Sequence, residues 1–154
     1  MLRTFRLATH LKELAKFQAT YLFLAALVIG AGTANGADVK VIANSSVGAS
    51  SVSSDELKGV FLATKSSLSD GSHVEPVLLK SGAVHEAFLK DYVGKTDSAL
   101  ETYYRSLVFT GKGSMPKAFA TDAEVVGYVE KTKGAIGYVA AGTSTASAKV
   151  LEVK

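Results

Sequence analysis

The seven residues KGAIGYV, from Lys133 to Val139, constrain the fold of this chain more than any other stretch. They follow a helix-start signal in which Thr121 and Glu124 stand three residues apart, as in a capping box. Gly134 predicts the end of that helix, because glycine takes the left-handed backbone conformation without a steric penalty. The apolar residues after it predict a buried strand. A helix that ends directly before a buried strand favours an α/β fold.

Residues 1–36 predict a signal peptide rather than a part of the folded domain. They begin with a basic region, continue with an apolar run at 21–31, and end in small residues that suit cleavage before Ala37. A transmembrane helix needs about 20 apolar residues, so this run favours cleavage, with an uncleaved anchor as the alternative. The chain has no cysteine to carry a lipid. We therefore expect a soluble product, periplasmic in a Gram-negative source.

The net positive charge of the chain comes from this leader. The whole sequence has 17 basic and 14 acidic residues, and removal of residues 1–36 leaves 13 of each. The pI near 9.0 therefore does not indicate a nucleic-acid partner. Without cysteine the chain also lacks disulfides, thiolate metal sites and a cysteine nucleophile. The remaining 118 residues suffice for one domain, residues 37–154.

Strand and helix patterns alternate along this domain. Capping signals occur at Ser53 with Glu56, at Ser81, at Ser98 with Glu101, and at Thr121. Pro76 places its strand near a sheet edge, because proline cannot donate to the ladder. We predict a three-layer α/β sandwich with a mixed sheet. The expected strands are 39–43, 74–79, 135–140 and 149–153, and the expected helices are 54–64, 83–93, 96–107 and one that begins near residue 121.

Four motifs in order resemble the phosphate-type substrate-binding proteins of ABC transporters. They are LKGVFL at 57–62, SDGS at 69–72, VFTGKG at 108–113 and GAIGYV at 134–139. The resemblance implies one lobe of a type II periplasmic binding protein, a non-enzymatic role and no cofactor. Full-length members of that family have two lobes and are more than twice this size, so half of the usual cleft is missing here.

In the family, an arginine and a Ser-Gly-Thr turn at a helix start hold phosphate. The matching segment here is LKSGAVH at 79–85, where Ser81 and Gly82 fit the turn and no arginine precedes them. A helix start offers free amides and a positive dipole end to an anion, and Lys80 or His85 adds positive charge. The alternative is that Ser81 only caps its own helix.

Other candidate sites are weaker. Ser45 and Ser46 follow the first strand, where α/β sheets commonly bind ligands, and a plain polar connection is the alternative. The GKGS segment at 111–114 lacks the spacing of a nucleotide-phosphate loop, so we expect a connecting loop there. His73 and His85 belong to different elements, which supports neither a metal site nor a hydrolase triad.

Two functional hypotheses follow. The first is an exported binding protein for phosphate or a similar small oxyanion, acting with an ABC permease in uptake or sensing. The second is a periplasmic structural or adaptor protein that kept the lobe, lost the ligand and binds another envelope protein. In either case a homo-oligomer is a possible source of the missing cleft wall. An enzymatic role has no residue constellation behind it.

Overall fold

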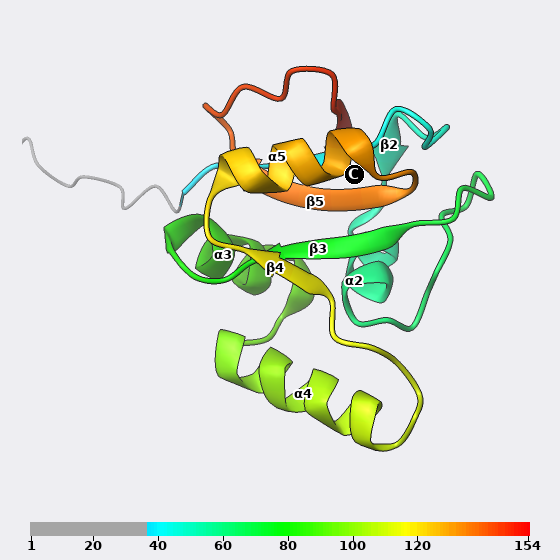
Figure 1. The fold of residues 1–154 in the computed structure, drawn as a ribbon, viewed down its shortest axis with the longest axis vertical. Helices are drawn as coiled ribbons and strands as arrows, with labels where there is room; N and C mark the ends of the chain where they lie inside the picture. The colour runs from blue at the N-terminus through cyan, green and yellow to red at the C-terminus, as the bar shows by residue number, and fades with distance from the viewer. Residues whose placement is uncertain (1–36) are drawn as a thin grey trace, which may run out of the picture. The chain divides into compact units, whose positions relative to one another are not determined.

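The computed structural model describes residues 37–154, and the predicted leader, residues 1–36, lies outside the described residues. The strands expected at 39–43, 135–140 and 149–153 are confirmed to the residue, and the strand of Pro76 begins one residue later than expected. Figure 1 shows the arrangement of the elements. In chain order they are β1 (Val39–Ala43), β2 (Ser51–Val52), α2 (Ser54–Phe61), β3 (Glu75–Leu79), α3 (Ala83–Phe88), the π-helical turn η1 (Leu89–Val93), α4 (Asp97–Phe109), β4 (Lys117–Phe119), α5 (Asp122–Lys131), β5 (Ala135–Ala140) and β6 (Lys149–Val153).

The six strands form one mixed sheet in the order β2-β6-β1-β5-β3-β4. β1 runs antiparallel to both of its neighbours, β5 and β6, whereas β3 is parallel to β5 and to β4, and β2 is parallel to β6. Five strands therefore point one way and β1 points the other way. Consequently β1 ends on one side of the domain, and the other five strands end on the opposite side.

Pro76 lies where β3 has one unpaired side. The amide of Glu75 donates to the carbonyl of Gly134 at the start of β5, so the next nitrogen along the chain faces the other neighbour, β4. Pairing with β4 begins only at Val77. The proline thus costs no ladder bond, which confirms its expected place near the edge of the sheet.

Helices cover both faces of the sheet. α5 packs on one face, where a side chain on Gly137 would collide with Val77 and Val125, and α2 and α3 pack on the other face (Figure 1). On that second face Tyr138 stacks on Phe88, with ring centroids 3.7 Å apart. The three-layer α/β sandwich with a mixed sheet is confirmed. Its core consists mainly of valine, leucine and aromatic side chains.

In Figure 1, α4 lies below the other helices, beyond the edge strand β4. Its buried residues are Leu100 and Tyr104, and Leu107 is half-buried. The hydroxyl of Tyr104 donates to the carbonyl of Phe61 at 2.6 Å, and the hydroxyl of Tyr103 donates to the carbonyl of Leu62 at 2.7 Å. These two hydrogen bonds fasten α4 to the carboxyl end of α2.

The helix caps agree with the sequence in two cases and differ in two. Ser53 with Glu56, and Thr121 with Glu124, form capping boxes as expected. For α4 the cap is Thr96, whose side chain accepts from the amide of Ala99, and not Ser98. For α3 the N-cap is Gly82, so the expectation of a Ser81 cap is wrong.

Two short strands escaped the sequence analysis. β2 has two residues and β4 has three, which is too short for an alternating pattern to emerge. Both lie at the outer edges of the sheet and extend it by pairing with β6 and β3.

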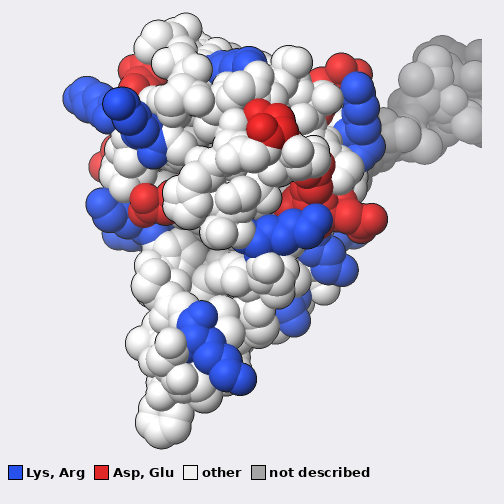
Figure 2. Space-filling model, turned by 90° about the vertical axis from the view of Figure 1, so that its right-hand side faces the viewer, with Lys and Arg blue, Asp and Glu red and all other residues white. Residues whose placement is uncertain are grey.

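The surface of the described domain carries both signs of charge. In Figure 2, basic and acidic side chains alternate over the upper part of the face that is shown. This mixture agrees with the balanced charge counted for residues 37–154.

Candidate functional site

The start of α3 is an exposed helix end without a side-chain cap. Lys80, Ser81 and Gly82 follow the carboxyl end of β3 and are all exposed. Gly82 has φ 108° and ψ 170°, a conformation open to glycine but strained for other residues, and no side chain bonds to the first turn. Ser81 stands one residue too early for capping geometry. The first amides of α3 are therefore left without a side-chain partner.

The space in front of this helix start is open. Apart from Gly82 itself and its two neighbours in the chain, no atom of residues 37–154 lies within 4 Å of a Cβ atom placed on Gly82. The helical segment continues through η1 to Val93, and its dipole favours negative charge at its beginning. Lys80 supplies a nearby positive charge, whereas Glu86 in the first turn supplies a negative one.

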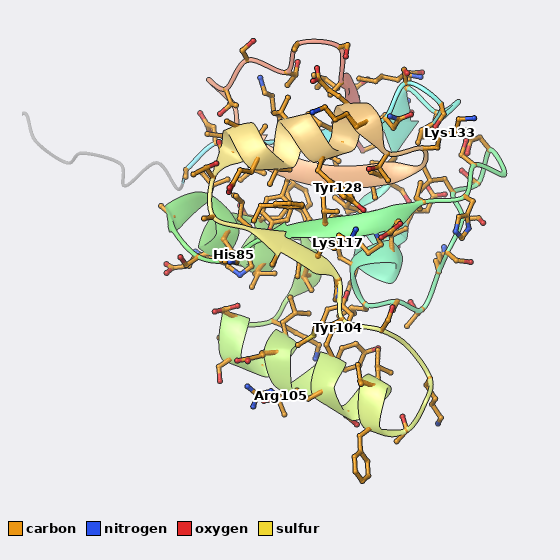
Figure 3. All side chains as sticks on the ribbon, in the orientation of Figure 1. His85, Tyr104, Arg105, Lys117, Tyr128 and Lys133 are labelled. Carbon is orange, nitrogen blue, oxygen red and sulfur yellow. The ribbon has the colours of Figure 1, made fainter. Side chains whose placement is uncertain are left out.

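His85 lies behind the helix start, inside the core. It is 1 % exposed, its Nδ1 is 2.5 Å from the hydroxyl of Tyr138, and its Nε2 is 3.0 Å from Oδ1 of Asp97. The Tyr138 hydroxyl also accepts the amide proton of Leu79 at 3.2 Å. Figure 3 shows His85 among the side chains between α3 and the sheet.

The direction of these bonds follows from the chemistry of the three groups. Burial raises the pKa of the Tyr138 hydroxyl, so the phenol keeps its proton and donates it to Nδ1 of His85. Nε2 of His85 then carries the other proton and donates to Asp97. Both nitrogens of His85 are thus engaged within the fold. The sequence-based idea that His85 adds charge to an anion site is therefore not supported.

A cavity of about 290 Å³ lies beside this network. Lys80, His85 and Asp97 line it together with Glu101 and apolar residues of β3 and α4. Two carboxylates and a single lysine among these lining residues do not favour an anion inside the cavity. On charge, the open helix start above it is the better place for one.

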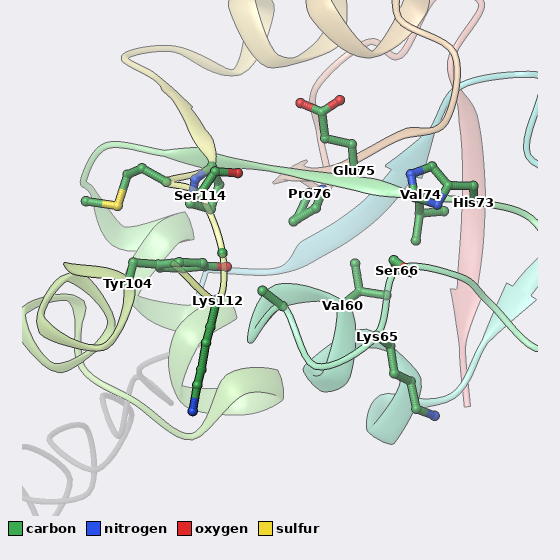
Figure 4. Close-up of a pocket in the computed structure, with 14 residues that line it drawn as sticks. Val60, Lys65, Ser66, His73, Val74, Glu75, Pro76, Tyr104, Lys112 and Ser114 are labelled. Carbon is green, nitrogen blue, oxygen red and sulfur yellow. The ribbon is translucent and has the colours of Figure 1, made fainter. Parts of the chain in front are cut away.

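A second cavity, of about 360 Å³, lies on the other side of Tyr104. Its lining is mixed: the apolar residues Val60, Val74 and Pro76 alternate with Lys65, Ser66, His73 and Glu75, and the loop that carries Lys112 and Ser114 forms one side (Figure 4). None of the residues predicted as ligand contacts lines it.

Ser45 and Ser46 lie at the opposite edge of the sheet from Ser81. The structure does not bring the two predicted groups together, because β1 runs against the other strands. The hydroxyl of Ser46 accepts from the amide of Gly134 at 3.1 Å, and its amide donates to the side chain of Asn44 at 3.0 Å. The turn after β1 is thus hydrogen-bonded to Gly134, the residue before β5.

Sequence reasoning missed the buried link among His85, Asp97 and Tyr138. The only available signal was a histidine on the inward face of a predicted helix. Its partners lie 12 and 53 residues away, and nothing in the spacing connects them. Across residues 37–154, no three histidine or acidic side chains gather as a metal site would require, and no helix there is long and apolar enough to cross a membrane.

Comparisons with solved structures agree with the fold. An ABC-type phosphate transport receptor from Vibrio cholerae is similar with a TM-score of 0.57 at 13 % identity, over 75 % of this chain and 46 % of that one. PstS from Borrelia burgdorferi is similar with a TM-score of 0.56 at 11 % identity, over 76 % and 47 %. A possible phosphate binding protein from Planctomyces limnophilus is similar with a TM-score of 0.53 at 14 % identity, over 76 % and 41 %.

These likenesses confirm the predicted resemblance at the level of the fold. The chain spans less than half the length of each of these structures. No protein-family model matches the sequence, and no curated protein matches it.

Proposed function

We propose that the chain is an exported, non-enzymatic binding protein. It binds phosphate or a similar small oxyanion at the start of α3 and functions in ABC-type uptake or sensing. The observation that carries this proposal is the uncapped, exposed helix start at Gly82. It lies at the sheet edge where five of the six strands end, which is where α/β sheets commonly bind ligands. Export with cleavage before Ala37 into the periplasm is part of the same proposal.

The expected affinity of the lone lobe is low. Three or four amide contacts at about 1 kcal/mol each reach only millimolar binding. Tight binding would require a second wall, from another copy of the chain, a permease or another envelope protein. The size of the chain relative to its structural neighbours supports this reasoning.

Titration calorimetry with phosphate and sulfate tests the site. Gly82→Asp places negative charge where the anion would dock and should abolish binding, whereas Gly82→Asn has nearly the same shape and strain without the charge. Lys80→Gln should weaken binding by about threefold to tenfold, and the exposed Lys90→Gln serves as its matched control. The absence of heat for wild-type protein at millimolar phosphate and sulfate, or equal loss in both Gly82 variants, would contradict the proposal.

The alternative function is an adaptor without ligand that binds another envelope protein. The observation that favours it is the pair Val108 and Phe109, which are 50 % and 92 % exposed at the end of α4. Contiguous exposed apolar side chains commonly mark interaction surfaces. Co-purification with one envelope protein, without oxyanion binding, would favour the adaptor.

A further inference from the structure

One buried hydroxyl group joins the two ends of the segment that contains the proposed oxyanion site. The Tyr138 oxygen accepts the amide proton of Leu79, the last residue of β3, and its hydroxyl donates to Nδ1 of His85, the third residue of α3. Residues 80–84 lie between these two contacts, and no side chain caps the helix start that they form. A single oxygen atom therefore fixes the separation between the two ends of an otherwise open loop.

The amide of Leu79 depends on this hydroxyl. Amides alternate in direction along β3: that of Glu75 donates toward β5 and that of Lys80 donates to β4, so that of Leu79 faces β5. The register between β3 and β5 covers Glu75 and Pro76 and ends before Leu79. Because a buried amide without an acceptor is costly, the Tyr138 hydroxyl takes the place of a strand partner.

The packing of the Tyr138 ring does not require the hydroxyl. Tyr138 is buried, and its ring stacks on that of Phe88, with the centroids 3.7 Å apart. A phenylalanine would keep this stack, whereas burial of a hydroxyl is unfavourable unless its hydrogen bonds are made. Both hydrogen bonds of this hydroxyl lead to the ends of the loop at 80–84. The hydroxyl thus serves the loop rather than the core.

Asp97, the first residue of α4, sets the direction of the bond between Tyr138 and His85. The Asp97 carboxylate accepts from Nε2 of His85 at 3.0 Å, which places the imidazole proton on Nε2 and leaves Nδ1 as an acceptor. The Tyr138 hydroxyl can then donate to Nδ1 while its oxygen accepts from Leu79. With the proton on Nδ1 instead, the hydroxyl would accept from both sides and its own proton would lose its partner.

We propose that Tyr138 and His85 are positioning residues of the oxyanion site. They hold the start of α3 against the end of β3, so that the free amides of the helix start keep one geometry before an anion arrives. A site that is ordered in advance binds more tightly, because binding no longer has to restrict its motion. The assignment rests on the proposed oxyanion site and adds to it two buried residues that need not touch the ligand.

An NMR titration of the full-length chain with phosphate, followed at the amide of Gly82, measures affinities in the millimolar range. Tyr138→Phe keeps the ring and removes both hydrogen bonds, and it should weaken phosphate binding by about threefold to tenfold. The matched control is Tyr104→Phe, because the Tyr104 hydroxyl is also buried and donates to a backbone carbonyl, that of Phe61. Tyr104→Phe should lower the unfolding temperature by a similar amount, about 4 °C, and keep the wild-type affinity.

Substitution of His85 tests the same link from the side of α3. His85→Asn keeps an acceptor near the place of Nδ1 and should retain most of the affinity. His85→Leu removes that acceptor and should weaken phosphate binding as much as Tyr138→Phe does. The double variant should bind no more weakly than either single variant, because both substitutions break one and the same link.

Hydrogen exchange provides a measurement without ligand. The amide of Leu79 should exchange at least about tenfold faster in Tyr138→Phe than in the wild type, and at the wild-type rate in Tyr104→Phe. An unchanged rate in Tyr138→Phe would show that the hydroxyl does not hold this end of the loop.

The binding results separate the possible failures. Equal phosphate affinity in the wild type and Tyr138→Phe would overturn the positioning role and leave the oxyanion site in place. Equal weakening in Tyr104→Phe and Tyr138→Phe would assign both effects to lost stability, which also overturns the role. Wild-type protein that binds no phosphate would overturn the proposed function together with the positioning role.

Discussion

The sheet has two opposite edges at which its strands begin and end, one with the segment after β1 and the other with the segment after β3. These two edges differ in how their polar groups are hydrogen-bonded. At the edge that carries Asn44, the side-chain amide of Asn44 donates to the carbonyls of Val129 and Glu130, at 2.7 and 2.9 Å. The hydroxyl of Ser46 accepts a hydrogen bond from the amide of Gly134. At the edge that carries Gly82, the first turn of α3 has no side-chain partner. Both edges carry small polar residues after a strand. Only the Gly82 edge keeps helix-start donors for a ligand, whereas the donors and acceptors of the Asn44 edge serve the fold.

The largest expected effect is at the closed edge. Asn44→Ala should lower the free energy of unfolding by about 3 kcal/mol, because it leaves the last carbonyls of α5 and the amide of Ser46 without their buried partner. Ser81→Ala should change it by less than about 0.5 kcal/mol, since Ser81 is exposed and caps nothing. Urea denaturation measures both. Equal losses would remove the contrast between the two edges.

The second test uses a glycine at each edge. Gly134 and Gly82 both have positive φ, but a Cβ on Gly134 would lie 2.7 Å from the carbonyl oxygen of His73, whereas one on Gly82 meets open space. Gly134→Ala should therefore lower the free energy of unfolding by about 3 kcal/mol, from the collision and backbone strain together. Gly82→Ala should lower it by about 1 kcal/mol, from backbone strain alone. Thermal unfolding provides the measurement. A Gly82 variant as unstable as the Gly134 variant would show that the helix start is more tightly built than its open surroundings suggest.

The smallest expected effect concerns the capped start of α2, where Glu56 belongs to the capping box, in contrast to the uncapped start of α3. Hydrogen bonds from the Ser69 side chain and from the backbone of Ser53 lower the pKa of Glu56 from 4.5 to about 2. A carboxylate with a depressed folded-state pKa contributes stability above pH 4.5 and loses it as the pH falls toward about 2. The contribution should be about 1 kcal/mol, because this carboxylate is largely solvated and screened.

Denaturation at a series of pH values checks this prediction. Glu56→Gln should be less stable at neutral pH and should lose part of the decline between pH 4.5 and 2. Ser69→Ala should weaken the same decline without removing the capping bond from Ser53. An unchanged acid profile in Glu56→Gln would contradict the assignment of the shifted pKa to this carboxylate.

Local signals in the sequence predicted most elements of the fold. Patterns within a few residues of each element predict the boundaries of β1, β5 and β6. They also predict the capping boxes of α2 and α5 and the inward faces of the helices. The same local reasoning failed for Ser81, because serine one residue before a glycine resembles a cap until the backbone angles of Gly82 are known. It failed for β2 and β4 because two or three residues show no period.

What the sequence by itself determined is the succession of strands and helices, the α/β class and the resemblance of the motifs. Only the tertiary structure decided that β1 runs against its neighbours, which separates Ser45 and Ser46 from Ser81 and Gly82. It also decided that His85 is held between Tyr138 and Asp97, and that Phe109 stays outside the core. The physical reason is the same in each case: strand direction, buried pairing and exposure depend on contacts between residues far apart in the chain, which local periodicity does not encode.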